Sequence, residues 1–400
     1  MSKEKLAIHG GEPVRSEKIY YGRQWINEDD VKAVSETLLS DYLTTGPKVA
    51  ALEDVLCEYT GAKFATVVSN GTAALHLAAI AAGIGEGDEV ITTGLTFMAS
   101  ANCALYCGGK PVFADIDPET YNIDPAEIEK KITSRTKAVV AVDYAGCSID
   151  HAAIREICDR HHLVFIEDAA HAIGTRDHGQ GVGSIADMTC FSFHPVKTVT
   201  SGEGGAITTN DPELHHKLQL LRSHGIEHDE ALMWEAPHEG IWYYEQQMLG
   251  YNYRLTDFQA ALLMSQMNRI DMFIERRHAI TEKYNAAFAD LPEIILQKEL
   301  PGTQNVHHLY EIRLNDELLS CTRREFFDAM SAENVQCQIH YVPVYWMPYY
   351  KSLGYTEGLC PNCEKVYKGI LSIPLYPRLT DAETDDVIKA VRKIVEWYRI

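Results

Sequence analysis

The sequence lacks the features that are typical of membrane, secreted or nucleic-acid-binding proteins. It has no run of about 18 consecutive apolar residues, so no transmembrane helix is expected. Its first residues have no long apolar core of the signal-peptide kind, and we expect a cytoplasmic protein. Basic residues are few, 36 Lys and Arg against 57 Asp and Glu, which gives a formal charge of -21. A field of that sign disfavours nucleic-acid and membrane-surface partners but allows one small anionic ligand held by local donors.

The sequence also lacks a cysteine pattern typical of disulfide frameworks or zinc sites. Its ten cysteines are scattered, and the only close pair is Cys360 and Cys363 in the stretch CPNC. A zinc or redox site would need a second pair or a thioredoxin-like setting, and we find neither. We therefore expect reduced thiols and no metal, and the role of the CPNC pair stays open.

What the sequence does contain is an alternation of strand-like and helix-like segments. Hydrophobic residues make up 46 % of the 400 residues, enough for a large core, and the length is typical of one large domain with a smaller one. The alternation predicts an α/β fold with a mainly parallel sheet and helices on both faces. In such sheets ligands bind beyond the carboxyl ends of the strands. The predicted strands lie within 64–70, 88–94, 111–117, 136–146, 163–170, 186–194 and 204–210.

A second, smaller α+β unit is predicted near the C-terminus. Residues 256–288 are expected to form one long helix or a kinked pair, which opens with Thr256 and Gln259 at capping-box spacing. Strands are then expected at 309–314 and 335–343, and helices at 323–333 and from a second capping box, Thr380 to Glu383. The predicted domains are 1–270, whose first 50 residues form an N-terminal arm, and 271–400.

The stretch SNGTAALHLA, which starts at Ser69, is the first candidate for a ligand site. A strand ends there and a helix begins near Thr72, so free N–H groups and the positive end of the helix dipole suit a phosphate. Gly71 would let an anion approach the backbone, and Thr72 would add a hydroxyl. An ordinary helix N-cap is the alternative.

A carboxylate and an aromatic ring follow two further strands. In VFIEDAAHA the strand leads to Asp168, and His171 comes shortly after. A carboxylate at the end of a buried strand is costly unless it meets a cation or several donors, although Asp168 could instead cap a helix. In TTGLTFMASAN, Phe97 lies just past a strand, where it could stack on a planar ligand or fill the core.

The stretch FSFHPVKTVTSGEGGAITTN places Lys197 between an apolar strand and a glycine-rich segment. An uncharged lysine amine is a nucleophile toward carbonyls, and partial burial lowers a lysine pKa toward that state. A lysine in a solvated loop is the alternative. The glycines do not have the spacing of a nucleotide-binding loop, and they precede a strand rather than a helix.

Together these groups suit pyridoxal 5'-phosphate. Its aldehyde would form an imine with Lys197, and its ring nitrogen would face Asp168. Its phosphate would take the Gly71–Thr72 helix start and the hydroxyl of Ser192. Its ring would lie against Phe97, with His171 nearby.

With these motifs, the sequence resembles the fold-type I, pyridoxal-phosphate-dependent sugar aminotransferases of the DegT/DnrJ/EryC1 group. The resemblance covers nearly the whole chain. The stretches that carry it are SNGTAALHLA, VDYAG, IEDAAHAIG, FSFHPVKTVTSGEGGAITTN, LRSHGI, GYNYRLTDFQAAL and IHYVPVY. Within the group, VDYAG, RSHG and IHYVP are most similar to enzymes that aminate C4 of a UDP-linked 4-keto-6-deoxy-N-acetylhexosamine on the way to pseudaminic acid.

The resemblance implies a role for each candidate residue. Lys197 would form the internal aldimine and move the proton, with Asp168 and His171 as the other catalytic residues, and glutamate would donate the amine. Relatives often carry glutamine at the position of His171, so the role of this histidine stays open. The cofactor contacts implied are Gly71, Thr72, Ala73, Phe97, Asp168, His171, Ser192, Lys197 and Asn252.

The resemblance also implies an obligate homodimer with shared active sites, because Asn252 would reach the phosphate from the partner subunit. The irregular segment 227–248 would cover a site or a subunit interface. The implied substrate contacts are Tyr21, Asp41, Tyr42, Leu43, Thr44, Gly71, Ser192, Asn252, His340, Tyr341, Val342 and Pro343.

Three other functions remain as alternatives. The first is amination of another nucleotide keto-sugar, a dTDP-linked 3- or 4-keto sugar or a UDP-linked 4-keto pentose. The second is a sugar dehydratase of the same fold, which would lack the lysine that is present here as Lys197. The third is a non-catalytic sensor that kept the fold.

Overall fold

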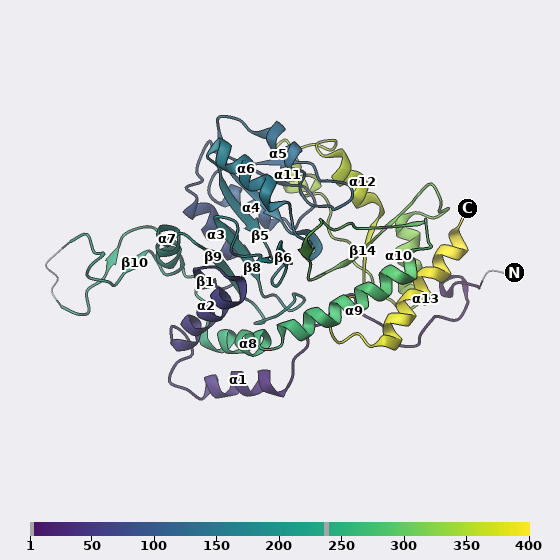
Figure 1. Ribbon diagram of the computed structural model, residues 1–400, viewed down its shortest axis with the longest axis horizontal. Coiled ribbons are helices and arrows are strands. Elements are labelled where there is room, and N and C mark those ends of the chain that lie inside the picture. Colours follow the sequence, from purple (N-terminus) through teal and green to yellow (C-terminus); the bar gives the residue numbers. More distant parts are fainter. Residues whose placement is uncertain (1–3, 236–239) are drawn as a thin grey trace.

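The computed structural model describes residues 4–235 and 240–400, and a seven-stranded sheet forms its centre (Figure 1). The strand order is β1-β9-β8-β5-β4-β2-β3, and within this sheet β9 runs antiparallel to both of its neighbours while the other pairs are parallel. The predicted mainly parallel sheet is confirmed. The strands are β1 (Phe64–Val68), β2 (Glu89–Thr93), β3 (Lys110–Ala114), β4 (Thr136–Val142), β5 (Val164–Asp168), β8 (Met188–Ser192) and β9 (Gly205–Thr209).

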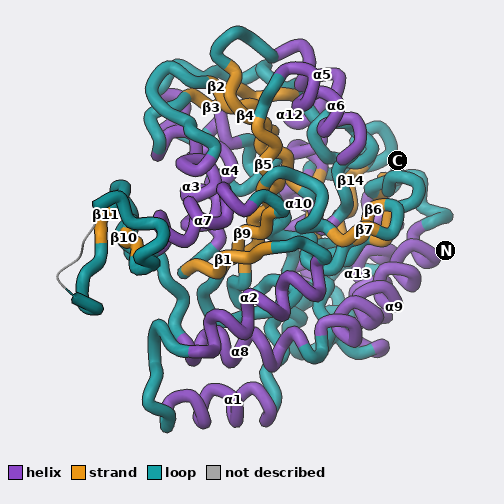
Figure 2. The backbone as a smooth tube through the Cα atoms, turned by 60° about the vertical axis from the view of Figure 1, so that its left-hand side comes forward, coloured by secondary structure: helices purple, strands orange, loops and turns teal. Residues whose placement is uncertain are grey.

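Helices cover both faces of this sheet, so β2 and β9 are buried along their whole length. Figure 2 shows the strands passing between the two groups of helices. One face packs on α3 (Gly71–Ala81), α4 (Ala99–Tyr106) and α7 (Pro212–Arg222). The other face packs on α2 (Pro47–Thr60), α5 (Pro125–Lys131), α6 (His151–His161) and α8 (Asp257–Met267).

The segment 256–288 is a kinked pair of helices. The first, α8, begins with the expected Thr256–Gln259 capping box, and the second, α9 (Ile270–Phe288), leads away from the sheet toward the C-terminal unit (Figure 1). The N-terminal helix α1 (Glu28–Leu38) packs along α8. Its buried Asp30 accepts a hydrogen bond from Nε2 of Gln266 at 2.7 Å, which fixes the arm to the large unit.

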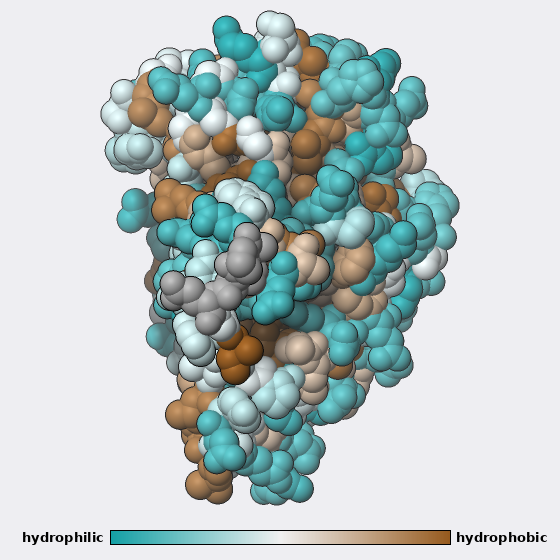
Figure 3. Space-filling view, turned by 90° about the vertical axis from the view of Figure 1, so that its left-hand side faces the viewer, coloured by the Kyte–Doolittle hydropathy of each residue, from teal (hydrophilic) through white to brown (hydrophobic). Residues whose placement is uncertain are grey.

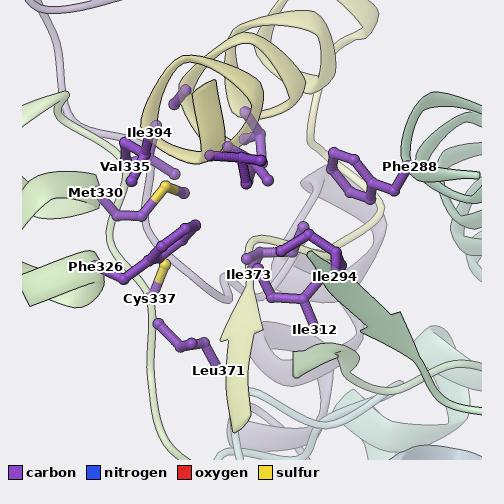
Figure 4. Packing of buried hydrophobic residues seen from close by; sticks show 14 of the residues in the cluster. Phe288, Ile294, Ile312, Phe326, Met330, Val335, Cys337, Leu371, Ile373 and Ile394 are labelled. Carbon is purple, nitrogen blue, oxygen red and sulfur yellow. The ribbon is translucent and has the colours of Figure 1, made fainter. Parts of the chain in front are cut away.

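The C-terminal unit has its own core around a three-stranded antiparallel sheet. Figure 4 shows Phe326, Met330, Ile373 and Ile394 pointing toward one another in this core. Leu6 and Ile19 belong to the same cluster, so the N-terminal segment packs on this unit as well. Its elements are β12 (Ile294–Leu296), β14 (Tyr310–Leu314), β15 (Ile370–Ile373), α10 (Arg323–Ala332) and α13 (Asp381–Tyr398), the last with its capping box. The helices α11 (Pro348–Ser352) and α12 (Pro361–Gly369) pack in a separate cluster with Phe113 of β3.

The prediction of a strand at residues 335–343 is wrong. This segment makes isolated bridges through Val335 and Gln338 but joins no ladder. After Gln338 the chain leaves the sheet and turns toward the cavity described below, and Pro343 cannot donate to a ladder. A second small sheet joins β6 (Arg176–Asp177), β7 (Gln180–Gly181) and β13 (Thr303–Gln304).

The segment 227–248 projects from the body of the molecule (Figure 1). Short strands β10 (Ile226–Glu227) and β11 (Glu245–Gln246) pair at its base, and residues 236–239 lie outside the described residues. Its apolar side chains are exposed, Trp234 at 74 % and Ile241 at 98 %, and Figure 3 shows hydrophobic residues on this face. Among residues 4–235 and 240–400, no helix has the length and apolarity needed to span a bilayer.

Candidate active site

A cavity of about 750 Å³ lies at the carboxyl ends of β1, β5 and β8. Its wall contains candidate residues from stretches that are far apart in the sequence. The sheet therefore brings these residues together within a single chain, as expected for a doubly covered parallel sheet. The candidates that line the cavity are Tyr21, Gly71, Thr72, Ala73, Phe97, Asp168, His171, Ser192, Lys197, His340 and Tyr341.

One end of the cavity is formed by the start of α3. Asn70 caps this helix, and its side chain accepts a hydrogen bond from the N–H of Ala73 at 2.8 Å. The N–H groups of Gly71 and Thr72 have no partner among the described residues, and they face the cavity together with Ser192. The stretch is thus both an ordinary capped helix and a cradle for an anion.

Two glycines allow the chain to pass close to this cradle. A Cβ atom on Gly71 would stand 2.9 Å from Cβ of Ser192, and one on Gly205 would stand 2.5 Å from the carbonyl oxygen of Asn70. Both distances are shorter than side chains tolerate. A larger residue at either position would therefore shift the helix start against β8 or β9.

Asp168 ends β5 and is buried at the floor of the cavity. Its Oδ2 accepts a hydrogen bond from Oγ of Ser100 at 2.6 Å, and its Oδ1 accepts one from the N–H of Ala170 at 3.1 Å. Burial raises the pKa of this carboxyl, and the two hydrogen bonds oppose that rise. No helix follows β5 directly, so the interpretation of Asp168 as a helix cap is wrong.

Lys197 lies in the turn after β8 and is partly buried. Its side chain faces the cavity and makes no hydrogen bond to any residue that the structure describes. Burial lowers its pKa to about 8, although Asp168 raises it. At neutral pH about one amine in ten would then be uncharged, against far fewer for a solvated lysine. Because Lys197 is partly buried and faces the cavity, it does not fit the alternative of a lysine in a solvated loop.

Aromatic rings line the other walls. Phe97 is 52 % exposed, so it is not a core residue, and its ring centre lies 6.2 Å from that of Tyr341. The hydroxyl of Tyr341 lies 3.2 Å from Nε2 of His171. Burial, with Lys197 nearby, lowers the pKa of His171 well below its usual value, so this ring is neutral at pH 7.

The remaining substrate candidates do not line the cavity of their own chain. Asn252 is exposed, while its neighbour Tyr253 lines the cavity. Residues 41–44 are exposed on the loop after α1. Val342 and Pro343 follow the two cavity residues His340 and Tyr341 but are not part of its wall.

Sequence reasoning missed several residues of this site. Ser100 is the partner of Asp168 and lies 2.7 Å from Oγ1 of Thr96. Its position on the first turn of α4, three residues after Phe97, was the only signal available. His76 and Tyr253 also line the cavity, with His76 Nδ1 3.2 Å from the Tyr253 hydroxyl, and their approach depends on the tertiary fold.

The cysteine pair and one acidic cluster lie outside the cavity. Cys360 and Cys363 are buried at the start of α12, whose N–H groups donate to the carboxylate of Asp115, and burial raises the pKa of the Cys360 thiol to about 12.

Ligand atoms of Asp143, His151 and Glu167 lie within 4.8 Å of one another. Both nitrogens of His151 already pair with carboxylates, Glu167 and Asp177, so this group is an ion-pair network.

The chemical groups that line the cavity fit pyridoxal 5'-phosphate. The cradle at Gly71 and Thr72 offers unpaired amides to a phosphate. Asp168 offers a buried carboxylate to a ring nitrogen, and Lys197 offers an amine with a lowered pKa to an aldehyde. Phe97 supplies an exposed ring face beside them. A chemically suitable partner for each of the four parts of the cofactor is therefore present.

Comparison with known proteins agrees with this geometry. Residues 24–392 match the model of the DegT/DnrJ/EryC1/StrS aminotransferase family. The spore coat polysaccharide biosynthesis protein SpsC of Bacillus subtilis is 42 % identical over 384 residues, which are 96 % of this chain and 98 % of SpsC.

Two solved structures share the whole fold. Helicobacter pylori PseC, an aminotransferase of pseudaminic acid biosynthesis, superposes with a TM-score of 0.88 at 32 % identity, over 96 % of this chain and 100 % of PseC. The pyridoxal-phosphate form of the putative sugar aminotransferase Spr1654 of Streptococcus pneumoniae has a TM-score of 0.88 at 29 % identity, over 95 % and 99 % of the two chains. The chain therefore belongs to the DegT/DnrJ/EryC1/StrS aminotransferase family and is a pyridoxal-phosphate-dependent sugar aminotransferase.

Proposed function

We propose that this enzyme transfers the amino group of glutamate to the C4 keto group of UDP-2-acetamido-2,6-dideoxy-hexos-4-ulose, in a pathway of the pseudaminic acid type. The observation that carries the catalytic part is the shared cavity of Lys197 and Asp168 beside the free amides of α3. The likeness to PseC and the stretches VDYAG, RSHG and IHYVP support the choice of sugar.

The residues at the cofactor end of the cavity each have a defined task in this proposal. When bound, pyridoxal 5'-phosphate supplies an aldehyde that takes up the amino group and a ring that withdraws electrons from the carbon losing its proton. Nζ of Lys197 holds the cofactor and, once released, moves the proton at the reacting carbon. Asp168 keeps the ring nitrogen protonated, and the amides of Gly71 and Thr72 with the Ser192 hydroxyl hold the phosphate.

We further propose a homodimer with shared active sites. Asn252 is exposed although Tyr253 beside it lines the cavity, so the loop presents alternate side chains to its own site and outward. The exposed apolar side chains of the 227–248 segment, Trp234, Ile241 and Trp242, would be covered by a second copy. Both proposed substrates are charged and soluble in water, and we propose that the reaction takes place in the cytoplasm.

A panel of UDP- and dTDP-linked 4-keto and 3-keto sugars, assayed with glutamate, tests the substrate. We expect 2-oxoglutarate and a 4-amino sugar from the UDP-linked 4-keto-6-deoxy-N-acetylhexosamine at the highest kcat/KM. Activity confined to 3-keto or to dTDP-linked sugars would contradict the substrate proposal and leave the family intact. The variant Lys197→Ala serves as the control for non-enzymatic amine exchange.

A further inference from the structure

A chain of three buried side chains runs from the C-terminal sheet to the cavity. Glu311 on β14 stands directly opposite Ser372 on β15. Oγ of Ser372 lies 2.6 Å from Oε1 of Glu311 and also 2.6 Å from Nδ1 of His340. His340 lines the cavity at the end where Tyr21 and Tyr341 form its wall. Nδ1 is occupied by Ser372, so Nε2 is the ring nitrogen that a ligand can reach.

Among the described residues, the carboxyl of Glu311 has no Lys or Arg partner, and the nearest ring nitrogen, Nδ1 of His340 at 3.9 Å, belongs to a neutral histidine. Glu311 is 3 % exposed, and its Oε2 has no hydrogen-bond partner among the described residues. Within the part of the chain that the structure describes, its hydrogen-bonding neighbours are Ser372 and the hydroxyl of Tyr144, which lies 3.2 Å from Oε1 and donates to the carbonyl oxygen of His340. An isolated carboxylate in such surroundings is costly, so the neutral acid is the stable form. Consistent with this, burial raises the pKa of Glu311 to about 8.

The direction of the hydrogen bonds follows from the neutral acid. Its O–H donates to Oγ of Ser372, so the single serine proton is free to point at Nδ1 of His340. Burial, with the charge of Lys197, lowers the pKa of His340 to about 4, so the ring is neutral and carries one proton. Because Nδ1 accepts from Ser372, that proton is on Nε2, which faces the cavity as a donor.

From this geometry we infer that Glu311 and Ser372 are positioning residues that hold His340 as the Nε2–H tautomer, so that it donates a hydrogen bond to an oxygen of the sugar substrate. The inference rests on the proposed function. The walls here are the neutral groups Tyr21, Tyr341 and His340. A neutral donor suits a carbonyl or hydroxyl oxygen of the sugar, whereas the carboxylates of glutamate favour a charged partner.

Holoenzyme variants measured separately in the two half-reactions test the inference. Ser372→Ala and Glu311→Leu each interrupt the series of hydrogen bonds from Glu311 to His340. We expect the kcat/KM of the sugar half-reaction to fall about 10- to 100-fold, as for loss of a buried hydrogen bond. The glutamate half-reaction, followed by the cofactor spectrum, should stay within about 2-fold. Equal losses in both half-reactions, or no loss in the sugar half-reaction, would overturn the inference.

Glu311→Gln is the discriminating control, because its amide N–H can replace the acid O–H toward Ser372 without a charge. We expect near wild-type turnover of the sugar at pH 7. A loss as large as that of Glu311→Leu would show that the carboxylate charge is required and would overturn the inference. Above pH 8, ionisation of Glu311 reverses the direction of the hydrogen bonds from Glu311 through Ser372 to His340. Wild type should therefore lose sugar turnover that Glu311→Gln retains.

Among the described groups around Glu311, Ser372 and His340, the tyrosines, thiols and histidines have pKa values shifted away from pH 8, with Lys197 as the exception. Burial raises the pKa of Tyr121 to about 12 and raises those of Tyr144 and Tyr341. The buried thiols Cys147 and Cys337 are raised as well, and His171 and His308 are lowered well below their usual pKa, so they stay neutral. Tyr21 is raised too. The exception, Lys197, is present in both proteins, so its contribution cancels in the comparison of wild type with Glu311→Gln.

A measurement without substrate keeps the two proposals apart. Nitrogen NMR of the histidine-labelled holoenzyme, with His340→Gln to assign the ring, reports the tautomer directly. We expect the Nε2–H form at pH 7 and the Nδ1–H form well above pH 8, where ionised Glu311 accepts the serine proton and Oγ of Ser372 accepts from Nδ1. An Nδ1–H ring in wild type would overturn the inference whatever the substrate is. If wild type shows the Nε2–H form but aminates none of the keto sugars, the proposed function fails instead.

Discussion

The two ends of the cavity are built in different ways. The cofactor end takes each of its groups from the end of a strand in the seven-stranded sheet, namely Gly71 after β1, Asp168 on β5 and Lys197 after β8. The substrate end takes Tyr21 from the N-terminal arm and His340 from a segment without regular structure. The lysine, the carboxylate and the free amides of the first end all come from one chain, whereas several candidates for the second end are exposed away from the cavity.

This difference separates the residues that amino transfer itself would require from those that can vary with the sugar. In our proposal, charge and burial at the cofactor end, where Lys197 and Asp168 face the same cavity, set the chemistry of amino transfer. The substrate end is neutral and aromatic, and we propose that it selects the sugar by hydrogen bonding and shape. Changes at the first end should abolish turnover, and changes at the second should alter which sugar reacts.

Lys197→Ala should have the largest effect. We propose that Lys197 both holds the cofactor and moves the proton, so the variant would lose both functions, and we expect kcat to fall at least about 10³-fold in both half-reactions. Absorbance of the bound cofactor and stopped-flow turnover are the measurements. Retention of both signals would contradict the role of Lys197 and erase the contrast between the two ends.

Asp168→Asn comes next. The amide keeps the shape and can still accept from the N–H of Ala170, but it cannot stabilise a protonated ring nitrogen, so we expect a loss of about 10²- to 10³-fold in kcat. Ser100→Ala, which removes the hydrogen bond to Oδ2 and the contact with Oγ1 of Thr96 but keeps the carboxylate of Asp168, is the matched control with an expected loss below about 10-fold. Equal effects of the two variants would show that hydrogen bonding, not charge, is what the ring nitrogen requires.

Asn252→Ala tests whether the cofactor end is shared between subunits. We expect cofactor affinity to fall about 10-fold, as for loss of one hydrogen bond to a charged phosphate. Equal mixing with Lys197→Ala subunits should restore activity at limiting cofactor, because in mixed dimers one site would be intact and about one site in four overall would be active. Failure of the mixture to exceed its separate components would exclude a site shared through Asn252.

The smallest effect concerns pH. Because burial lowers the pKa of Lys197 to about 8, the uncharged amine grows as pH rises toward 8, and the apoenzyme should capture pyridoxal phosphate faster up to that point. Stopped-flow capture rates between pH 6 and 10 measure this, and the expected midpoint lies near 8. A rate still climbing tenfold per unit at pH 9.5 would mean that the lysine is solvated.

Most of the fold and the cofactor end could be predicted from the sequence, for a physical reason. Short apolar runs followed by Gly71, Asp168 or Lys197 are local signals, and the parallel sheet places their ends side by side. The same local reasoning failed at residues 335–343, where tertiary contacts bend the chain out of a strand. Ser100, Glu311 and Ser372 could not be found, because nothing in their neighbours along the chain indicates the groups they meet across the fold.

The most direct test of the central claim is chemical. Borohydride reduction of the holoenzyme should fix the cofactor to the amine that holds it, and peptide mass spectrometry then locates the modified residue. We expect a single phosphopyridoxyl group on Lys197, in the peptide that contains FSFHPVK. Modification of another lysine, or no stable modification of a protein that still aminates its substrate, would contradict the account.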